Sequence, residues 1–170
     1  MAAILMLFGS GCGTSNAASI QPAPALLASS GPTTPEPRGD AILSISGLVA
    51  TALNLSYEEV TALTAVRVEA VLYCPGVYEN QPTREWYGVP VSALLSGAGL
   101  KTEASRVVFS AADGYMTTLS LEKINASGAI LAYRVDGADL SKADGYPLRL
   151  VSNDLIGDIW IRWVSRIEVV

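Results

Sequence analysis

The first 35 residues contain no charged side chain, and this feature most limits what the chain can fold into. From Thr14 to Gly39 the chain is rich in Ala, Ser, Thr and Pro and shows no sustained helix or strand period. Such a composition buries too little apolar surface to offset the loss of chain entropy. We therefore interpret residues 13–39 as a tether and expect one domain over residues 40–170, which are 131 of the 170 residues.

The start of the chain predicts export. The apolar run 2–8, followed by Gly-Ser-Gly and Cys12, is typical of a signal-peptide core and is too short to span a bilayer as a mature helix. Residues 1–12 resemble a bacterial lipoprotein signal, although no Lys or Arg precedes the run and Gly9 stands where Leu is usual. The resemblance implies an exported, membrane-anchored lipoprotein, on the periplasmic or cell-surface side, lipidated at Cys12. An ordinary cleaved signal peptide is the alternative.

Composition excludes several classes of function. Sixteen acidic and 11 basic residues give a formal charge of −5, which argues against a partner rich in phosphate such as nucleic acid. The sequence has no His, so it contains no His-based triad and no His-based zinc site. Its two Cys residues are too few for a disulfide framework or a four-thiolate metal site.

The pattern over residues 40–170 is dominated by strands. Alternating or continuous apolar runs predict strands at 42–49, 66–73, 106–110, 129–135, 148–151 and 159–170. Ser56 begins a Ser-x-x-Glu capping box that predicts a short helix through Leu63. Residues 91–95 predict a second short helix, ended by Gly-Ala-Gly at 97–99. Asp-Gly pairs at 113–114 and 136–137 predict turns.

Cys74 lies where an apolar strand meets a Pro-Gly breaker. A thiolate at such a strand end suits a soft or transition metal. The alternative is a buried structural cysteine, because Cys also packs as a small hydrophobic residue.

Two other places have side chains that suit ligand binding. Residues 113–115, Asp-Gly-Tyr, offer a carboxylate and a phenol, but Asp-Gly is also a common turn. Arg149, Arg162 and Arg166 recur in the last two predicted strands, where guanidinium groups can bind phosphate. The alternative to phosphate binding is that these arginines are solvent-exposed. Strand alternation predicts that Arg162 and Arg166 share one face.

Five ordered blocks together resemble the sulfite-oxidase-type molybdopterin-binding domain, in its small single-domain bacterial form. The blocks are YCPG at 73–76, WYGVPVSALL at 86–95, SAADGY at 110–115, GYPLRLV at 145–151 and WIRWVSRIEV at 160–169. The resemblance covers nearly all of residues 41–170. It implies an α+β fold of mixed, strand-dominated sheets with two or three short helices, holding molybdenum on a single molybdopterin.

The resemblance also assigns site residues. In that family one cysteine thiolate is the only protein ligand of molybdenum, and Cys74 falls on its motif. Arg162 matches a basic position that helps to hold the pterin phosphate. The candidate cofactor-binding residues are Tyr73, Cys74, Gly76, Asp113, Gly114, Tyr115, Arg149 and Arg162.

Two functions follow. The first is a molybdenum oxidoreductase that transfers an oxygen atom to or from a small substrate and exchanges electrons with a separate carrier, since the chain has no haem or flavin motif. The second is a non-catalytic, ligand- or partner-binding lipoprotein that kept the fold and lost the metal. The retained Cys74 favours the first function, and Asp158-Ile159, where larger members often have a basic residue, favours the second.

Overall fold

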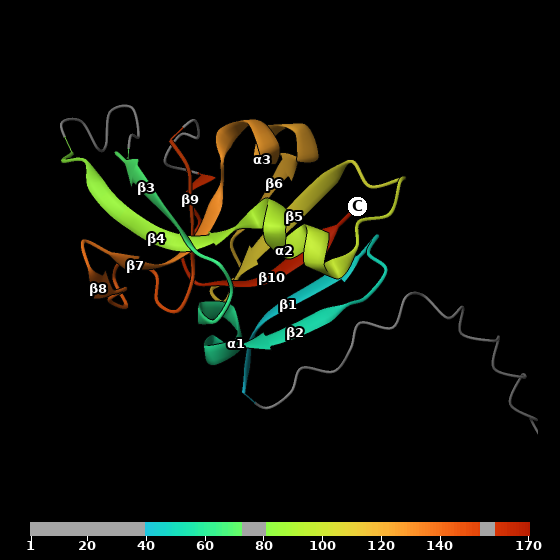
Figure 1. The fold of residues 1–170 in the computed structure, drawn as a ribbon, viewed down its shortest axis with the longest axis horizontal. Helices are drawn as coiled ribbons and strands as arrows, with labels where there is room; N and C mark the ends of the chain where they lie inside the picture. The colour runs from blue at the N-terminus through green and yellow to red at the C-terminus, as the bar shows by residue number, and fades with distance from the viewer. Residues whose placement is uncertain (1–39, 73–80, 154–158) are drawn as a thin grey trace, which may run out of the picture. The chain divides into compact units, whose positions relative to one another are not determined.

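Two five-stranded sheets form the framework of the protein, as a computed structural model describes it for residues 40–72, 81–153 and 159–170 (Figure 1). The first sheet has the strand order β2-β1-β10-β5-β6. Its strands are β1 (Ala41–Gly47), β2 (Leu53–Ser56), β5 (Arg106–Ala111), β6 (Met116–Ser120) and β10 (Val164–Val169). The second has the order β3-β4-β7-β8, with β9 paired to β7. Its strands are β3 (Val66–Ala70), β4 (Arg84–Pro90), β7 (Ile130–Val135), β8 (Ala138–Asp139) and β9 (Arg149–Val151).

One parallel pair makes the first sheet mixed. The first and last strands of the fold, β1 and β10, lie side by side in parallel, with Ser44 opposite Arg166 (Figure 1). The other pairs in both sheets are antiparallel. The predicted α+β class with mixed, strand-dominated sheets is therefore confirmed.

Local capping explains the three short helices. Helix α1 (Tyr57–Thr61) begins after Ser56, whose side chain accepts a hydrogen bond from the Glu59 N–H while the Glu59 carboxylate accepts one from the Ser56 N–H. Helix α2 (Val91–Ala98) ends at Gly99, which has φ +71°. Helix α3 (Leu121–Ser127) lies in a stretch where we predicted no helix, and Ser120 caps its first turn through the Lys123 N–H. In the described ranges no helix is long and apolar enough to cross a membrane.

The core joins the two sheets. A cluster of buried hydrophobic side chains takes Ile45, Phe109 and Ile167 from the first sheet and Trp86 and Leu131 from the second. These residues belong to one compact unit, Pro32–Val170. Burial on this scale fixes the positions of the strand ends and of the polar residues that they carry.

The last strand is shorter than predicted. The sequence pattern placed a strand over residues 159–170, but β10 begins only at Val164. Trp163 has φ +57°, outside the extended range, so strand alternation does not reach Arg162. The expectation that Arg162 and Arg166 share one strand face is therefore wrong. Arg166 lies within β10, opposite Ser44 of β1 and Ser110 of β5.

Candidate functional site

The site residues predicted around Cys74 fall outside the described part of the chain. Tyr73, Cys74 and Gly76 belong to the range 73–80. The described strands on either side of this range are antiparallel neighbours, because Ala70 of β3 is opposite Arg84 of β4. The Arg84 end of this strand pair therefore flanks the range that contains Cys74.

Arg84 is held by two carboxylates distant in sequence. Its Nε donates to Asp136 Oδ2 at 2.7 Å, and its Nη1 donates to Asp144 Oδ1 at 3.0 Å. Burial lowers the pKa of Arg84, but the hydrogen bonds to Asp136 and Asp144 outweigh it and raise that pKa above its usual value. Arg84 is thus a permanent cation with a fixed orientation.

Ser141 completes what we call the Arg84 network, which consists of Arg84, Asp136, Ser141 and Asp144. The Ser141 hydroxyl donates to Asp144 Oδ2 at 2.6 Å and accepts from the Asp144 N–H at 3.1 Å. The hydrogen bond from Ser141, together with Arg84, outweighs burial and lowers the pKa of Asp144. The Glu85 N–H, and then Arg84, lower the pKa of Asp136. Both carboxylates are therefore ionised across the physiological range.

Arg149 lies in an indole clamp, which we define as the rings of Trp86 and Trp160. Its guanidinium carbon is 5.3 Å from the Trp86 centroid and 5.9 Å from the Trp160 centroid. The two rings meet edge to face at 5.7 Å. Only 7% of Arg149 is exposed, so the alternative of a solvent-exposed arginine is wrong for this residue.

A loop over residues 141–147 links Arg149 to Arg162. Nη1 of Arg149 donates to the Asp144 carbonyl at 2.9 Å, and Nη1 of Arg162 donates to the Ala143 carbonyl at 3.2 Å. The Trp163 indole donates to the preceding carbonyl, that of Lys142, at 2.9 Å. Three consecutive carbonyls of the 141–147 loop are thus bound by side chains from the last two predicted motif blocks.

Arg162 differs from Arg149 in its exposure. Its side chain is exposed, and its guanidinium carbon lies 4.7 Å from the centroid of the Trp163 ring. Gly145, with φ +113°, leaves room for it, because a Cβ on Gly145 would come within 3.0 Å of the Arg162 Cβ and Cγ. Arg162 is thus an arginine that is exposed to solvent beside the 141–147 loop, as an anchor for an anion requires.

The Asp113–Tyr115 segment is a turn, as its Asp-Gly pair predicts. The Tyr115 N–H donates to Asp113 Oδ1 at 3.0 Å, and Gly114 has φ +91°. The following hairpin strand β6 pairs with β5, and the Ala112 N–H donates to the Trp163 carbonyl at 2.9 Å. The structure therefore places this predicted site segment next to the backbone beside Arg162.

The sequence reasoning named as site residues none of the members of the Arg84 network and neither ring of the indole clamp, which are Arg84, Asp136, Ser141, Asp144, Trp86 and Trp160. The two tryptophans stand in the motif blocks, so their signal was available. Arg84 and Asp144 have no local signal, because 60 residues separate the two members of the ion pair.

Comparisons with known proteins agree with the fold. The chain matches the oxidoreductase molybdopterin binding domain family over residues 32–170. It is 30% identical over 126 residues to the uncharacterized oxidoreductase YuiH of Bacillus subtilis (strain 168), covering 74% of this chain and 63% of that protein. It is 27% identical over 158 residues to an NADH nitrate reductase of Volvox carteri, covering 75% of this chain and 18% of that protein.

A solved structure gives the same result. The crystal structure of the sulfane dehydrogenase SoxCD from Paracoccus pantotrophus aligns with a TM-score of 0.67 and 27% identity, over 75% of this chain and 37% of that chain. The fold and the match along residues 32–170 define a molybdopterin-binding class of domain. This chain belongs to the oxidoreductase molybdopterin binding domain family. It spans less than two thirds of the length of each of these three relatives.

Proposed function

We propose that this protein holds molybdenum on a single molybdopterin, with Cys74 as the protein ligand, and transfers an oxygen atom to or from a small substrate. Electrons pass to or from a separate carrier protein. The observation that carries the proposal is the family match over residues 32–170. Cys74 lies within this range, in the YCPG block at 73–76 that resembles the family's cysteine motif. A thiolate is a soft, strongly donating ligand that suits a transition metal.

The donors at the Arg84 end of the second sheet fit such a cofactor. Trp86 Nε1 is buried and has no hydrogen-bond partner among the described residues. Because an indole N–H can only donate, it can bind an acceptor atom of a ligand. The Trp86 ring lies under the guanidinium groups of Arg84 and Arg149, whose carbons are 5.5 Å and 5.3 Å from its centroid. An anionic or carbonyl-rich group such as a pterin phosphate accepts from donors of this kind. In the described ranges no three His, Cys, Asp or Glu side chains form a metal site of their own.

When bound, the cofactor supplies the two-electron chemistry of oxygen-atom transfer. The protein residues bind and orient it. Arg149 fixes the 141–147 loop from below the surface, since its guanidinium is held by two rings and the Asp144 carbonyl. Arg162, which donates to the Ala143 carbonyl of the same loop but is itself exposed, is the residue that we propose to bind the pterin phosphate. The adjoining turn consists of Asp113, Gly114 and Tyr115.

Metal analysis of Cys74→Ala tests the ligand. The full chain, made in a host that synthesises the cofactor, is expected to contain about one molybdenum per chain, and Cys74→Ala is expected to lose it. Cys12→Ala is the matched control, because Cys12 is the second of the two cysteines and lies in the predicted signal. Full occupancy in Cys74→Ala would remove Cys74 from the proposal. Wild-type protein with neither molybdenum nor pterin would favour the non-catalytic binding lipoprotein.

A pair of arginine variants tests the phosphate contact. Arg162→Ala is expected to release pterin and molybdenum during dialysis faster than Arg166→Ala, because Arg166 lies in β10 between β1 and β5 and away from the 141–147 loop. A charge-assisted contact with phosphate contributes roughly 1.5–3 kcal/mol, which corresponds to about 10- to 100-fold in retention. Equal retention of pterin and molybdenum by the two variants would mean that donors other than Arg162 bind the pterin phosphate.

We also propose that residues 1–11 are removed and that lipidated Cys12 anchors the protein outside a membrane. The support is the uncharged apolar run followed by Gly-Ser-Gly-Cys. Mass spectrometry of the mature protein is expected to show an N-terminal Cys12 with attached lipid. An intact Met1 would contradict export, and a soluble form beginning after Cys12 would contradict lipidation.

A further inference from the structure

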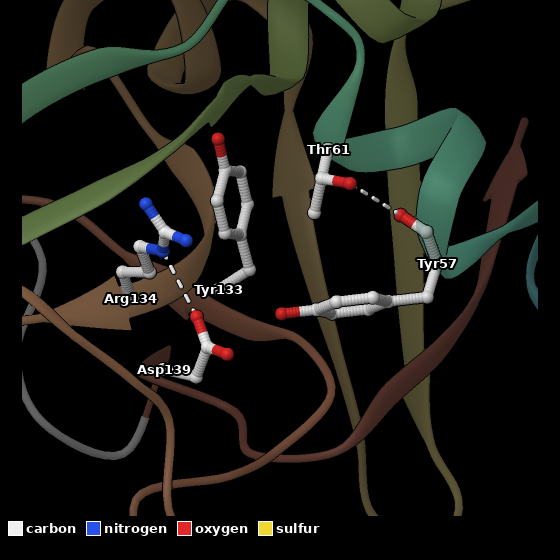
Figure 2. A pocket seen from close by; sticks show the side chains of 5 residues that line it. All are labelled: Tyr57, Thr61, Tyr133, Arg134 and Asp139. Atoms are coloured by element: carbon white, nitrogen blue, oxygen red, sulfur yellow. Dashed lines mark hydrogen bonds and ion pairs between the residues drawn. The ribbon is translucent and has the colours of Figure 1, made fainter.

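A pocket of about 290 Å³ lies against the β7–β8 hairpin and helix α1 (Figure 2). We call it the tyrosine pocket, and its lining residues are Tyr57, Thr61, Tyr133, Arg134 and Asp139. Tyr57 and Thr61 come from the two ends of α1, Tyr133 and Arg134 from β7, and Asp139 from β8. None of these residues belongs to the Arg84 network or to the indole clamp.

Two aromatic rings form a corner of the pocket. The rings of Tyr57 and Tyr133 are nearly perpendicular, at 80°, with centroids 6.5 Å apart. Tyr146 supports this corner, since its ring lies 5.6 Å from that of Tyr57. In Figure 2 the Tyr57 hydroxyl points toward Asp139, while the Tyr133 ring stands between Arg134 and Thr61. The electron-rich faces of such rings attract ammonium groups, methylated ones above all.

An ion pair with spare hydrogen-bonding capacity forms the charged wall. Arg134 Nε donates to Asp139 Oδ1 at 2.9 Å, with 54% and 59% of the two side chains exposed. Among the side-chain hydrogen bonds of the described residues, this contact is the one that involves Arg134 or Asp139, so the Arg134 Nη groups and Asp139 Oδ2 keep hydrogen-bonding capacity. The pair therefore offers donors for a carboxylate and an acceptor for a cation at the same place.

Two hydroxyl groups of the pocket, those of Tyr57 and Thr61, are uncharged. Burial, and then the Asp139 carboxylate, raise the pKa of Tyr57, so its phenol stays protonated at neutral pH. The Thr61 hydroxyl donates to the backbone, with the Tyr57 carbonyl at 3.0 Å and the Glu58 carbonyl at 3.2 Å. The charges that a ligand meets in the tyrosine pocket are therefore those of Arg134 and Asp139.

We propose that the tyrosine pocket binds a small zwitterion that carries a carboxylate and a methylated ammonium group. The carboxylate binds the Arg134 Nη groups, and the ammonium lies against the Tyr57–Tyr133 corner beside Asp139. A lone anion meets repulsion from Asp139, and a lone cation meets repulsion from Arg134. The opposite charges of the wall thus select a ligand with both charges.

Three probes that differ by one charge test this inference on the full chain. Glycine betaine carries both groups, choline lacks the carboxylate, and 3,3-dimethylbutanoate replaces the ammonium nitrogen by carbon. We expect saturable binding of glycine betaine, observed by nuclear magnetic resonance titration, and binding at least about tenfold weaker for the other two probes. Choline or 3,3-dimethylbutanoate binding as tightly as glycine betaine would overturn the proposal, and so would no saturable binding of glycine betaine.

Variants locate the binding. Arg134→Ala and Asp139→Asn are expected to weaken glycine betaine binding about tenfold, whereas Arg166→Ala, an exposed arginine in another sheet, leaves it unchanged. Unfolding curves of each variant establish that the comparison uses folded protein. Binding that is unchanged in both pocket variants would place the zwitterion elsewhere and overturn the assignment. The outcome does not depend on molybdenum content.

Discussion

Two ion-pair sites involve the β7–β8 hairpin, and they differ in how strongly they are restrained. In the Arg84 network one guanidinium binds two carboxylates, at 2.7 Å and 3.0 Å, and lies over the Trp86 ring. In the tyrosine pocket Arg134 binds Asp139 alone, at 2.9 Å, and both side chains are more than half exposed. The distances are nearly equal, so distance does not decide what each pair contributes. Burial and the number of partners make one region a fixed support and leave the other open to a ligand.

The largest effect is expected where restraint is greatest, at Arg149. Arg149→Ala removes a hydrogen bond to the Asp144 carbonyl and contacts with two indole rings, and it leaves a cavity in the indole clamp. We expect a loss of about 3 kcal/mol in the free energy of unfolding, measured by urea denaturation. Arg166→Ala is the control, because Arg166 is exposed. A similar small change in both variants would show that the clamp is not a fixed support.

The second prediction concerns the 141–147 loop. Gly145→Ala introduces a Cβ within 3.0 Å of the Arg162 side chain at a residue with φ +113°, so it combines backbone strain with a close contact. We expect a cost of roughly 1–3 kcal/mol in the free energy of unfolding. Gly137→Ala is a matched control, since Gly137 has φ +80° but open space around its Cβ position. An equal cost in both would mean that packing against Arg162 contributes nothing.

The third prediction concerns the pH dependence of the Arg84 network. The pKa of Asp144 is lowered in the folded protein, so its ionised form stabilises the fold fully above the unfolded pKa, which is about 3.9. This contribution is lost as the pH falls below about 4 and through the folded pKa. Asp144→Asn removes it. The difference in urea midpoint between wild type and Asp144→Asn is therefore expected to shrink below about pH 4, and a constant difference would contradict it.

The smallest effect on stability is expected at the Arg134–Asp139 pair of the tyrosine pocket. Arg134→Ala leaves the urea midpoint unchanged within error, because both members of the pair are largely exposed and screened by solvent. Arg84→Ala in the same experiment lowers the midpoint, because its guanidinium has two carboxylate partners. A comparable loss in the two variants would remove the contrast between the regions.

Local chemistry predicted the turns and most of the helix ends. The capping box at Ser56 forms as its spacing predicts, and the Asp113-Gly114 turn closes the hairpin between β5 and β6. Helix α3 escaped prediction although Ser120 caps it, because Lys123 stands at the position where Glu59 completes the capping box of α1, so the reciprocal signal is missing. Short segments between strands carry too few periods to separate helix from sheet.

The sequence by itself determined the family and the strand-dominated pattern and named Arg149 as a candidate site residue, because these depend on ordered motifs and local periodicity. Only the tertiary structure decided the environment of each arginine. It enclosed Arg149 between two indoles, paired Arg84 with a carboxylate 60 residues away, and separated Arg162 from Arg166 through the left-handed backbone of Trp163. Burial and pairing depend on contacts between distant segments, and these contacts exist only once the sheets have packed.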